Sequence, residues 1–142
     1  MYNEVLLEHN LYPKNRGKLA KAEIERGLKN ASCGDKIFVQ LKIEDGKIAD
    51  GKFSGIGCAI SLASADLMIE TIRGKTIKEA EELREKFRKM ILSGEDFKNE
   101  DSMEDLGVSL ALGVVARMPA RAKCAELAWQ IFDVKKEDAE YL

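Results

Sequence analysis

The fold changes character within one stretch of the chain, which reads Ser54-Gly-Ile-Gly-Cys-Ala-Ile-Ser-Leu-Ala-Ser-Ala-Asp-Leu-Met68. Two glycines precede Cys58, and glycine allows the backbone to turn sharply or to approach another group closely. Small and apolar residues follow as far as Gly74, as expected for a helix that ends at a glycine. We therefore expect Cys58 at the start of a helix, where free N–H groups and the helix dipole favour a thiolate.

Before this stretch, apolar residues recur at every second position, which predicts a strand with one buried face. Phe38 interrupts the alternation, so we expect the other face to be partly covered. Asp45-Gly46 is a strong hairpin signal, with a partner strand over 47–53 and an earlier strand between 22 and 30. These strands form a small three-stranded antiparallel sheet, and the alternating residues of its central strand are Ile37, Val39, Leu41 and Ile43.

The rest of the chain is predicted to be helical. Thr76 to Glu79 reads as a capping box, Pro13 ends the first helix and Pro119 marks the entry to the last. The polar, acidic segment 93–104 is expected to be a solvated loop, with a lid or docking segment as the alternative. A helix, then strands, then helices predict an α+β fold with the helices mainly on one face of the sheet. The expected helices are 2–11, 59–73, 77–90, 106–116 and 120–132.

The composition is that of an ordinary soluble protein. The 142 residues are 45% apolar and 34% charged, with a formal net charge of -2, so one domain over residues 1–142 is expected. This weak charge gives no reason to expect nucleic acid as a partner. No apolar run approaches the roughly 18 residues that a membrane span needs, and the first residues lack the features of a signal peptide. We expect a cytoplasmic protein that does not bind membranes.

Three widely spaced cysteines, Cys33, Cys58 and Cys124, are the residues from which we predict chemistry. Their odd number, in a domain of this size, argues for reduced thiols rather than disulfides. The glycine between Cys33 and Asp35 lets both face one point, and the second hairpin strand would bring Cys58 close to them. Cys124 would join them only if the last helix packs beside the helix after Cys58. Three thiolates and one carboxylate suit tetrahedral Zn²⁺, and thiolates also bind the irons of a cluster.

Other interpretations of the cysteines are weaker or simpler. Three inert buried cysteines are the simplest alternative. No Cys-x-x-Cys pair is present, which argues against a zinc finger or a thioredoxin-like site. A cysteine protease needs a base, and the single histidine, His9, lies far in sequence from every cysteine, so we expect it to pack or to hydrogen-bond. Gly55-Ile56-Gly57 lacks the rest of either glycine-rich phosphate motif.

Three cysteine motifs occur in order along nearly the whole chain: Cys33-Gly34-Asp35, Gly55-Ile56-Gly57-Cys58-Ala59-Ile60-Ser61 with Ala63-Ser64-Ala65, and Arg121-Ala122-Lys123-Cys124-Ala125 with Leu127-Ala128-Trp129. Together with the N-terminal His9, Pro13, Asn15 and Gly17, they resemble the IscU/NifU-like family of iron–sulfur cluster assembly scaffolds. The resemblance implies an α+β fold on which clusters are built from iron and from sulfur delivered by a cysteine desulfurase. It also implies apo iron–sulfur proteins as recipients.

Two departures from the IscU pattern, together with the long acidic insertion before the last helices, resemble the SufU branch most. IscU-type members have histidine before the third cysteine, where this chain has Lys123. Their Leu-Pro-Pro-Val-Lys motif, read by an Hsp70-type chaperone, is here Met118-Pro119-Ala120-Arg121-Ala122. The resemblance to SufU implies Zn²⁺ held by the three cysteines and the aspartate, and persulfide sulfur accepted from a desulfurase. No Hsp70-type chaperone partner is expected.

The leading hypothesis is a scaffold, not an enzyme in its own right, that receives sulfur and passes on sulfur or a nascent [2Fe–2S] cluster. Cys33, Cys58 and Cys124 would bind metal or cluster, and Asp35 would be a fourth, more exchangeable ligand. Cys124 is our candidate persulfide acceptor, because Arg121 and Lys123 nearby would favour its thiolate. The alternatives are a SufU-type zinc-dependent sulfurtransferase that holds no stable cluster, and a purely structural zinc-binding interaction domain.

Overall fold

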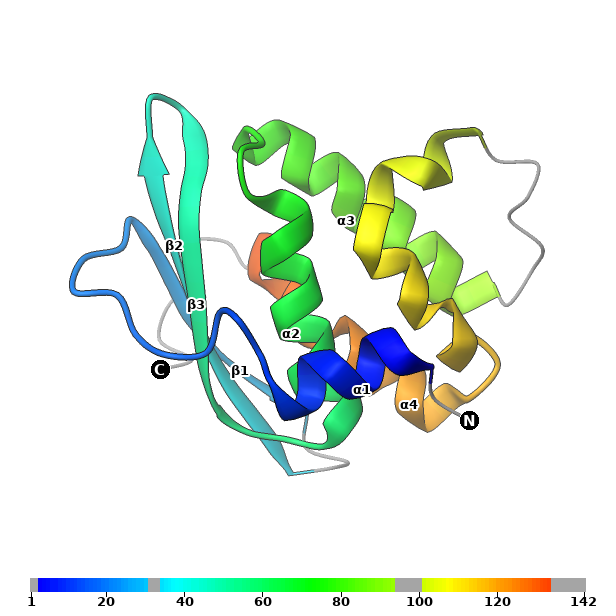
Figure 1. The fold of residues 1–142 in the computed structure, drawn as a ribbon. Coiled ribbons are helices and arrows are strands. Elements are labelled where there is room, and N and C mark those ends of the chain that lie inside the picture. The colour runs from blue at the N-terminus through cyan, green and yellow to red at the C-terminus, as the bar shows by residue number, and fades with distance from the viewer. Residues whose placement is uncertain (1–2, 31–33, 94–100, 134–142) are drawn as a thin grey trace.

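The computed structural model describes residues 3–30, 34–93 and 101–133, and it confirms the predicted α+β fold (Figure 1). The α-helices (α) and 3₁₀ helices (η) cover one face of a three-stranded sheet. In chain order the elements are α1 (Glu4–Leu11), β1 (Ile24–Asn30), β2 (Asp35–Glu44), β3 (Lys47–Ile56), α2 (Ala59–Ile72), α3 (Ile77–Ser93), η2 (Asp101–Val115), α4 (Pro119–Glu126) and η3 (Ala128–Phe132).

The sheet is an antiparallel meander in the order β1-β2-β3. Asp45 and Gly46 form the predicted hairpin turn, and both have positive φ angles, of 53° and 76°, as a tight turn matched to the strand twist requires. The third strand is longer than the predicted range 47–53, because pairing continues until Ile56 lies opposite Lys36. This extension carries the end of β3 to the same end of the sheet as the start of β2.

A segment before β1 crosses the outer face of the sheet. Gly17 donates its backbone N–H to Phe53 of β3, and Leu19 then exchanges two hydrogen bonds with the side chain of Gln40 on β2. The crossing chain buries Gln40, and Phe38 on the same face is half-buried. The prediction that the outer face is partly covered is therefore confirmed.

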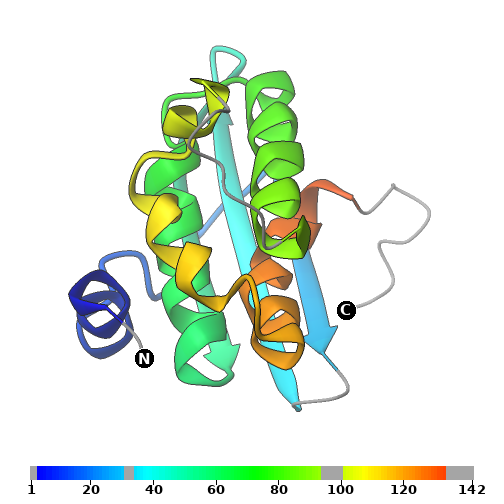
Figure 2. The same cartoon turned by 90° about the vertical axis from the view of Figure 1, so that its right-hand side faces the viewer.

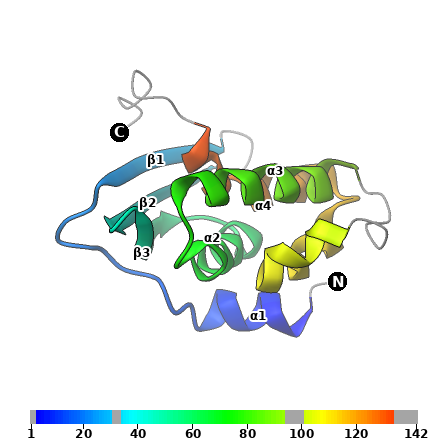
Figure 3. The same ribbon diagram turned by 90° about the horizontal axis from the view of Figure 1, so that it is seen from above.

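The helices pack on the opposite face, with α2 at their centre (Figures 2 and 3). Ten of the fourteen residues of α2 are buried, because the helix contacts β3, α1, η2, α4 and η3. The glycine stop is also confirmed, since Gly74 follows the helix with a φ of 87°. No helix within the described residues is long and apolar enough to cross a membrane.

Two predicted helical ranges are wrong in detail. The expected helix 106–116 is a 3₁₀ helix that starts earlier, at Asp101 inside the predicted acidic loop, and is interrupted at Gly107 with a φ of 51°. Residues 94–100 of that loop lie outside the described residues. The expected helix 120–132 is divided into α4 and η3, because Leu127 bonds to the carbonyl three residues before it rather than four. The tighter turn lets Trp129 stack on Phe87 of α3, with ring centroids 4.8 Å apart.

Candidate metal centre

Three of the four predicted ligands lie together at one end of the molecule. The ligand atoms of Asp35, Cys58 and Cys124 all lie within 4.8 Å of one another. Asp35 and Cys124 are buried, and Cys58 is half-exposed. The fourth predicted ligand, Cys33, lies outside the described residues. The site is built where β2 begins, where β3 ends and where α2 begins, at the lower end of the molecule in Figure 1.

Asp35 joins the sheet to the first turn of α2. It is the first residue of β2 and points to the helix side of the sheet, like the buried Ile37 two residues on. One carboxylate oxygen accepts the backbone N–H of Cys58 at 3.0 Å, and the other accepts the hydroxyl of Ser61 at 2.6 Å. A carboxylate at a helix N-terminus satisfies free N–H groups and is favoured by the helix dipole. Asp35 is therefore held in place before any metal binds.

The two glycines before Cys58 allow this close approach. Gly55 has a φ of 114°, and a Cβ on it would lie 2.1 Å from the carbonyl oxygen of Lys36. A Cβ on Gly57 would lie 3.1 Å from that of Ser61 and 3.3 Å from Oδ1 of Asp35. Any side chain at Gly55 would push β3 away from β2, and one at Gly57 would crowd the Asp35 carboxylate.

Cys58 is the N-cap of α2, as its position after the glycines predicted. Its Sγ accepts the backbone N–H of Ser61 at 3.4 Å, and the Ser61 hydroxyl lies at the same distance. Burial raises the pKa of the Cys58 thiol and the nearby Asp35 carboxylate also raises it, but hydrogen bonds from Ser61 and Cys124 outweigh both. The pKa of Cys58 therefore lies below its ordinary value, which favours the thiolate that binds metal.

Cys124 reaches the site because α4 packs beside α2, the condition that the sequence left open. The Ser64 hydroxyl of α2 donates to the backbone carbonyl of Ala125 at 2.5 Å. Buried Arg84 on α3 holds the end of α4 through Glu126, at 3.1 Å. The amide of Asn30, at the end of β1, lies 3.8 Å from the Cys124 sulfur. Contacts with α2, α3 and β1 thus fix the position of Cys124.

The basic residues predicted to assist Cys124 are on the surface. Arg121 and Lys123 are both exposed on α4, whereas the Cys124 thiol is buried. Their influence on this thiol stays a prediction. Sequence reasoning missed Ser61, Ser64 and Asn30, whose contacts with the site come from tertiary packing; only the position of Ser61, three residues after a predicted N-cap, gave a signal.

The donor set fits a thiophilic metal ion. Two thiols and a carboxylate within 4.8 Å of one another can converge on a single tetrahedral ion. Thiolates with one carboxylate suit Zn²⁺ or the irons of a cluster better than Ca²⁺ or Mg²⁺, which prefer oxygen ligands. His9 is not part of this set. It is buried against α2 and hydrogen-bonded to Asp66, which confirms the predicted structural role.

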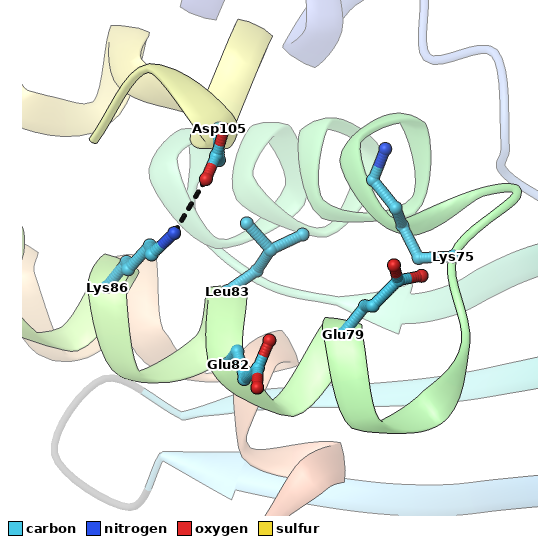
Figure 4. A pocket seen from close by; sticks show the side chains of 6 residues that line it. All are labelled: Lys75, Glu79, Glu82, Leu83, Lys86 and Asp105. Atoms are coloured by element: carbon cyan, nitrogen blue, oxygen red, sulfur yellow. Dashed lines mark hydrogen bonds and ion pairs between the residues drawn. The ribbon is translucent and has the colours of Figure 1, made fainter. Parts of the chain in front are cut away.

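A separate hollow of about 330 Å³ lies between α3 and the start of η2 (Figure 4). Lys86 and Asp105 face each other across it and form an ion pair at 2.7 Å. Glu79 at its other end completes the predicted capping box with Thr76, at 2.9 and 3.0 Å. Lys86, Asp105 and Glu79 already serve structural contacts, and none of the described candidate metal ligands lines the hollow.

The fold and the thiol–carboxylate site define a class of small α+β proteins that can bind a thiophilic metal ion at one end. Residues 1–130 match the model of the family described as NifU-like N terminal domain. The chain belongs to this family.

Relatives of the chain carry two kinds of name. It is 42% identical to the iron–sulfur cluster assembly scaffold protein IscU of Thermotoga maritima, over 92% of this chain and 88% of the relative. It is 38% identical to the zinc-dependent sulfurtransferase SufU of Bacillus subtilis, over 97% of this chain and 92% of the relative. A solved structure of a putative SUF-system scaffold protein from Fervidobacterium islandicum superposes with a TM-score of 0.82 at 36% identity, covering 93% of both chains.

Proposed function

We propose that this chain is an iron–sulfur cluster assembly protein that accepts sulfur from a cysteine desulfurase. It passes sulfur, or a nascent [2Fe–2S] cluster, to apo iron–sulfur proteins. The observation that carries the proposal is the convergence of Asp35, Cys58 and Cys124 at one end of the molecule. Cys33 completes the proposed ligand set. Relatives named as scaffold and as sulfurtransferase support the same role.

The sulfur-transfer step needs only thiol chemistry. A desulfurase presents a cysteine persulfide, and a thiolate of this chain attacks its outer sulfur. A new S–S bond forms, the S–S bond of the donor breaks, and the donor cysteine leaves as a thiolate that takes up a proton. No oxidant or reductant is consumed, because one persulfide replaces another.

Cys124 is the proposed acceptor. Since Cys124 is buried, the proposal requires that docking of the desulfurase uncovers this sulfur. The half-exposed Cys58, whose pKa is lowered, is the competing acceptor.

Two versions of this function differ in what the site binds, either Zn²⁺ or a [2Fe–2S] cluster. A bound Zn²⁺ would hold the sulfurs as thiolates in a defined arrangement until transfer, and Cys33, Asp35, Cys58 and Cys124 would bind it. This version is supported by the sulfurtransferase name of the Bacillus relative. In the scaffold version the same residues bind a [2Fe–2S] cluster as cargo.

The residues before Cys124 are the basis for our proposal about partner proteins. Lys123 precedes Cys124, and Met118-Pro119-Ala120 replaces the double proline of the chaperone motif. We therefore propose a desulfurase and apo target proteins as partners, without an Hsp70-type chaperone.

The test is transfer of ³⁵S from labelled cysteine, through a purified cysteine desulfurase, to this chain. Wild type should acquire reducible label, and Cys124→Ser should acquire less than a tenth as much while keeping its circular dichroism spectrum. Cys58→Ser should still be labelled at Cys124, because the acceptor thiol remains.

The labelling pattern distinguishes the two candidate acceptors and tests the function itself. Full labelling of Cys124→Ser, with loss in Cys58→Ser, would move the acceptor to Cys58. No labelling of wild type would contradict the function itself. The metal content and visible absorbance of the same protein, purified without oxygen, assign the cargo: a colourless zinc protein supports the sulfurtransferase version, and a coloured iron protein the scaffold version.

A further inference from the structure

The outer face of the sheet ends in a row of three side chains beside the metal centre. Lys29, Lys36 and Ile56 lie opposite one another across β1, β2 and β3. They point away from the helices, because the next pair along the strands, Leu28 and Ile37, is buried in the core. Both lysines are exposed, and Ile56 is 71% exposed. We call Lys29, Lys36, Ile56 and the neighbouring Phe38 the sheet-tip patch.

The two lysines of this patch repel each other when no partner is bound. Lys29 and Lys36 are direct cross-strand partners, and like charges in that position destabilise a sheet. Within the part of the chain that the structure describes, neither lysine forms an ion pair with a carboxylate, whereas Lys42 on the same strand pairs with Glu44. An acidic group placed between Lys29 and Lys36 would relieve their repulsion. The arrangement therefore favours an anionic partner.

Behind this row the surface is hollowed and partly apolar. A depression of about 300 Å³ is lined by both lysines, by Phe38 and by Gly27. The space exists because Gly27, which lies opposite Phe38, has no side chain to fill it. With Ile56 at its edge, the depression offers apolar contact next to positive charge. It fits an acidic segment that also carries an apolar side chain.

The patch is continuous with the metal centre. Lys36 directly follows Asp35, and Ile56 lies two residues before Cys58. The described strand and helix ends around the centre carry exposed basic side chains, whereas their acidic residues are buried (Asp35) or half-buried and already paired with Arg84 (Glu126). This local excess of positive charge contrasts with the net charge of -2 of the whole chain. The exposed basic side chains are Lys29, Lys36, Arg121 and Lys123.

We propose that the sheet-tip patch is the surface on which the sulfur-donating protein docks, through an acidic and partly apolar segment. The inference rests on the proposed function and deepens it, because it names the surface that aligns the donor with the thiols. A partner seated on Lys29, Lys36 and Ile56 would lie at the end of the sheet where β2 begins and β3 ends, next to the strand ends that lead to Asp35 and Cys58. Opposite charges across such a contact speed association and set its orientation.

The test compares two charge reversals in the protein carrying its natural metal content. Lys29→Glu places a glutamate opposite Lys36, and Lys21→Glu makes the same change at an exposed site near the far end of β1. The probe is a purified cysteine desulfurase, titrated by calorimetry at 50 and 300 mM salt. Ile56→Ser tests the apolar part, with Val108→Ser on η2 as its control.

We expect Lys29→Glu to raise Kd at least about tenfold at low salt and to weaken the salt dependence. Ile56→Ser should raise Kd at least about fivefold, and both controls should stay within about twofold of wild type. At saturating desulfurase, Lys29→Glu should still accept sulfur, since every thiol is intact. Its unfolding midpoint should not fall, because the substitution turns a like-charge pair into an opposite-charge pair.

Each remaining outcome would contradict the docking surface. If wild type accepts sulfur but Lys29→Glu and Lys21→Glu bind the desulfurase equally well, the docking proposal fails and the proposed function stands. If wild type accepts no sulfur, both fail together. If Lys29→Glu instead abolishes self-association in sedimentation experiments, or binding of a short single-stranded DNA, while desulfurase binding is unchanged, the patch serves a second copy or a nucleic acid.

Discussion

At the scale of single residues, Ser61 connects two of the candidate ligands. Its hydroxyl lies 2.6 Å from Oδ2 of Asp35 and 3.4 Å from Sγ of Cys58. A hydroxyl has one proton to donate, so it can serve the carboxylate or turn to the thiolate once Cys58 ionises. The backbone N–H of Ser61 also donates to the same sulfur. One buried serine thus adjusts both the position of Asp35 and the acidity of Cys58.

Replacing this hydroxyl should make Cys58 less acidic. In Ser61→Ala the backbone N–H remains but the hydroxyl donor is lost, so the pKa of Cys58 should rise toward its ordinary value. Because the thiolate is the reactive form, alkylation of Cys58 in the metal-free protein at pH 7 should slow, and its pH midpoint should move upward. Iodoacetamide labelling followed by mass spectrometry of the Cys58 peptide measures both quantities.

Ser54→Ala is the matched control, since Ser54 is half-buried on β3 and the described contacts of Cys58 do not include it. An unchanged alkylation profile in Ser61→Ala would show that the hydroxyl does not act on the thiol.

At the scale of elements, the junction between β3 and α2 depends on a single backbone conformation. Gly55 has a positive φ, and its Cα faces the carbonyl of Lys36 so closely that a Cβ would overlap it. Arg16 donates to the Gly55 carbonyl at 2.7 Å, which fixes the peptide from the other side. The direction in which the chain leaves β3, and with it the position of Cys58, is determined at this residue.

Two glycine substitutions separate backbone strain from steric overlap. Gly46→Ala, in the hairpin turn with a φ of 76° and open space around it, should lower the free energy of unfolding by about 1–2 kcal/mol. Gly55→Ala adds the overlap with Lys36 and should cost at least about 3 kcal/mol.

Urea unfolding measures both free energies, and zinc binding should weaken only in Gly55→Ala. Equal losses in the two variants would mean that the strand end moves aside without strain.

At the scale of the whole molecule, a buried polar cluster ties the N-terminal helix to the rest of the fold. Asp66 on α2 is fully buried and is hydrogen-bonded to His9 of α1. It also accepts the backbone N–H of Asn15 at 2.7 Å and the amide of the same residue at 3.0 Å. Asn15 in turn is bonded to Arg73 at the end of α2. The helix and the segment that starts across the sheet are therefore fixed to α2 by the same carboxylate.

Removing His9 should weaken this connection. In His9→Ala the Asp66 carboxylate loses one buried partner, and we expect a loss of about 2 kcal/mol in the free energy of unfolding. His9→Gln keeps an N–H donor and should lose less than half as much. Urea unfolding gives both values, and hydrogen exchange of the α1 amides should accelerate most in His9→Ala. A loss below about 0.5 kcal/mol in His9→Ala would contradict this role.

The predicted elements that the structure confirms are those that neighbouring residues specify. Alternation, the Asp45-Gly46 turn, the capping box and the glycine stop act between neighbouring residues, so those elements were predicted from the sequence. The division of the last helix into α4 and η3 was not, because the tighter turn at Leu127 accompanies long-range stacking of Trp129 on Phe87. The same limit explains why Ser64 and Asn30 were not expected near Cys124.

By itself, the sequence determined that Cys58 lies at the start of a helix after two glycines and that Asp35 lies directly before the central strand, which in the structure begins at Asp35 itself. Both follow from the conformations that a few adjacent residues can adopt. Only the tertiary structure decided that Cys124 lies beside them, because that depends on α4 packing against α2. It also placed Lys29 opposite Lys36, since strand register is set by which faces can be buried together. Local backbone preferences determine the conformations around Asp35 and Cys58, and burial of apolar surface brings these segments and Cys124 together.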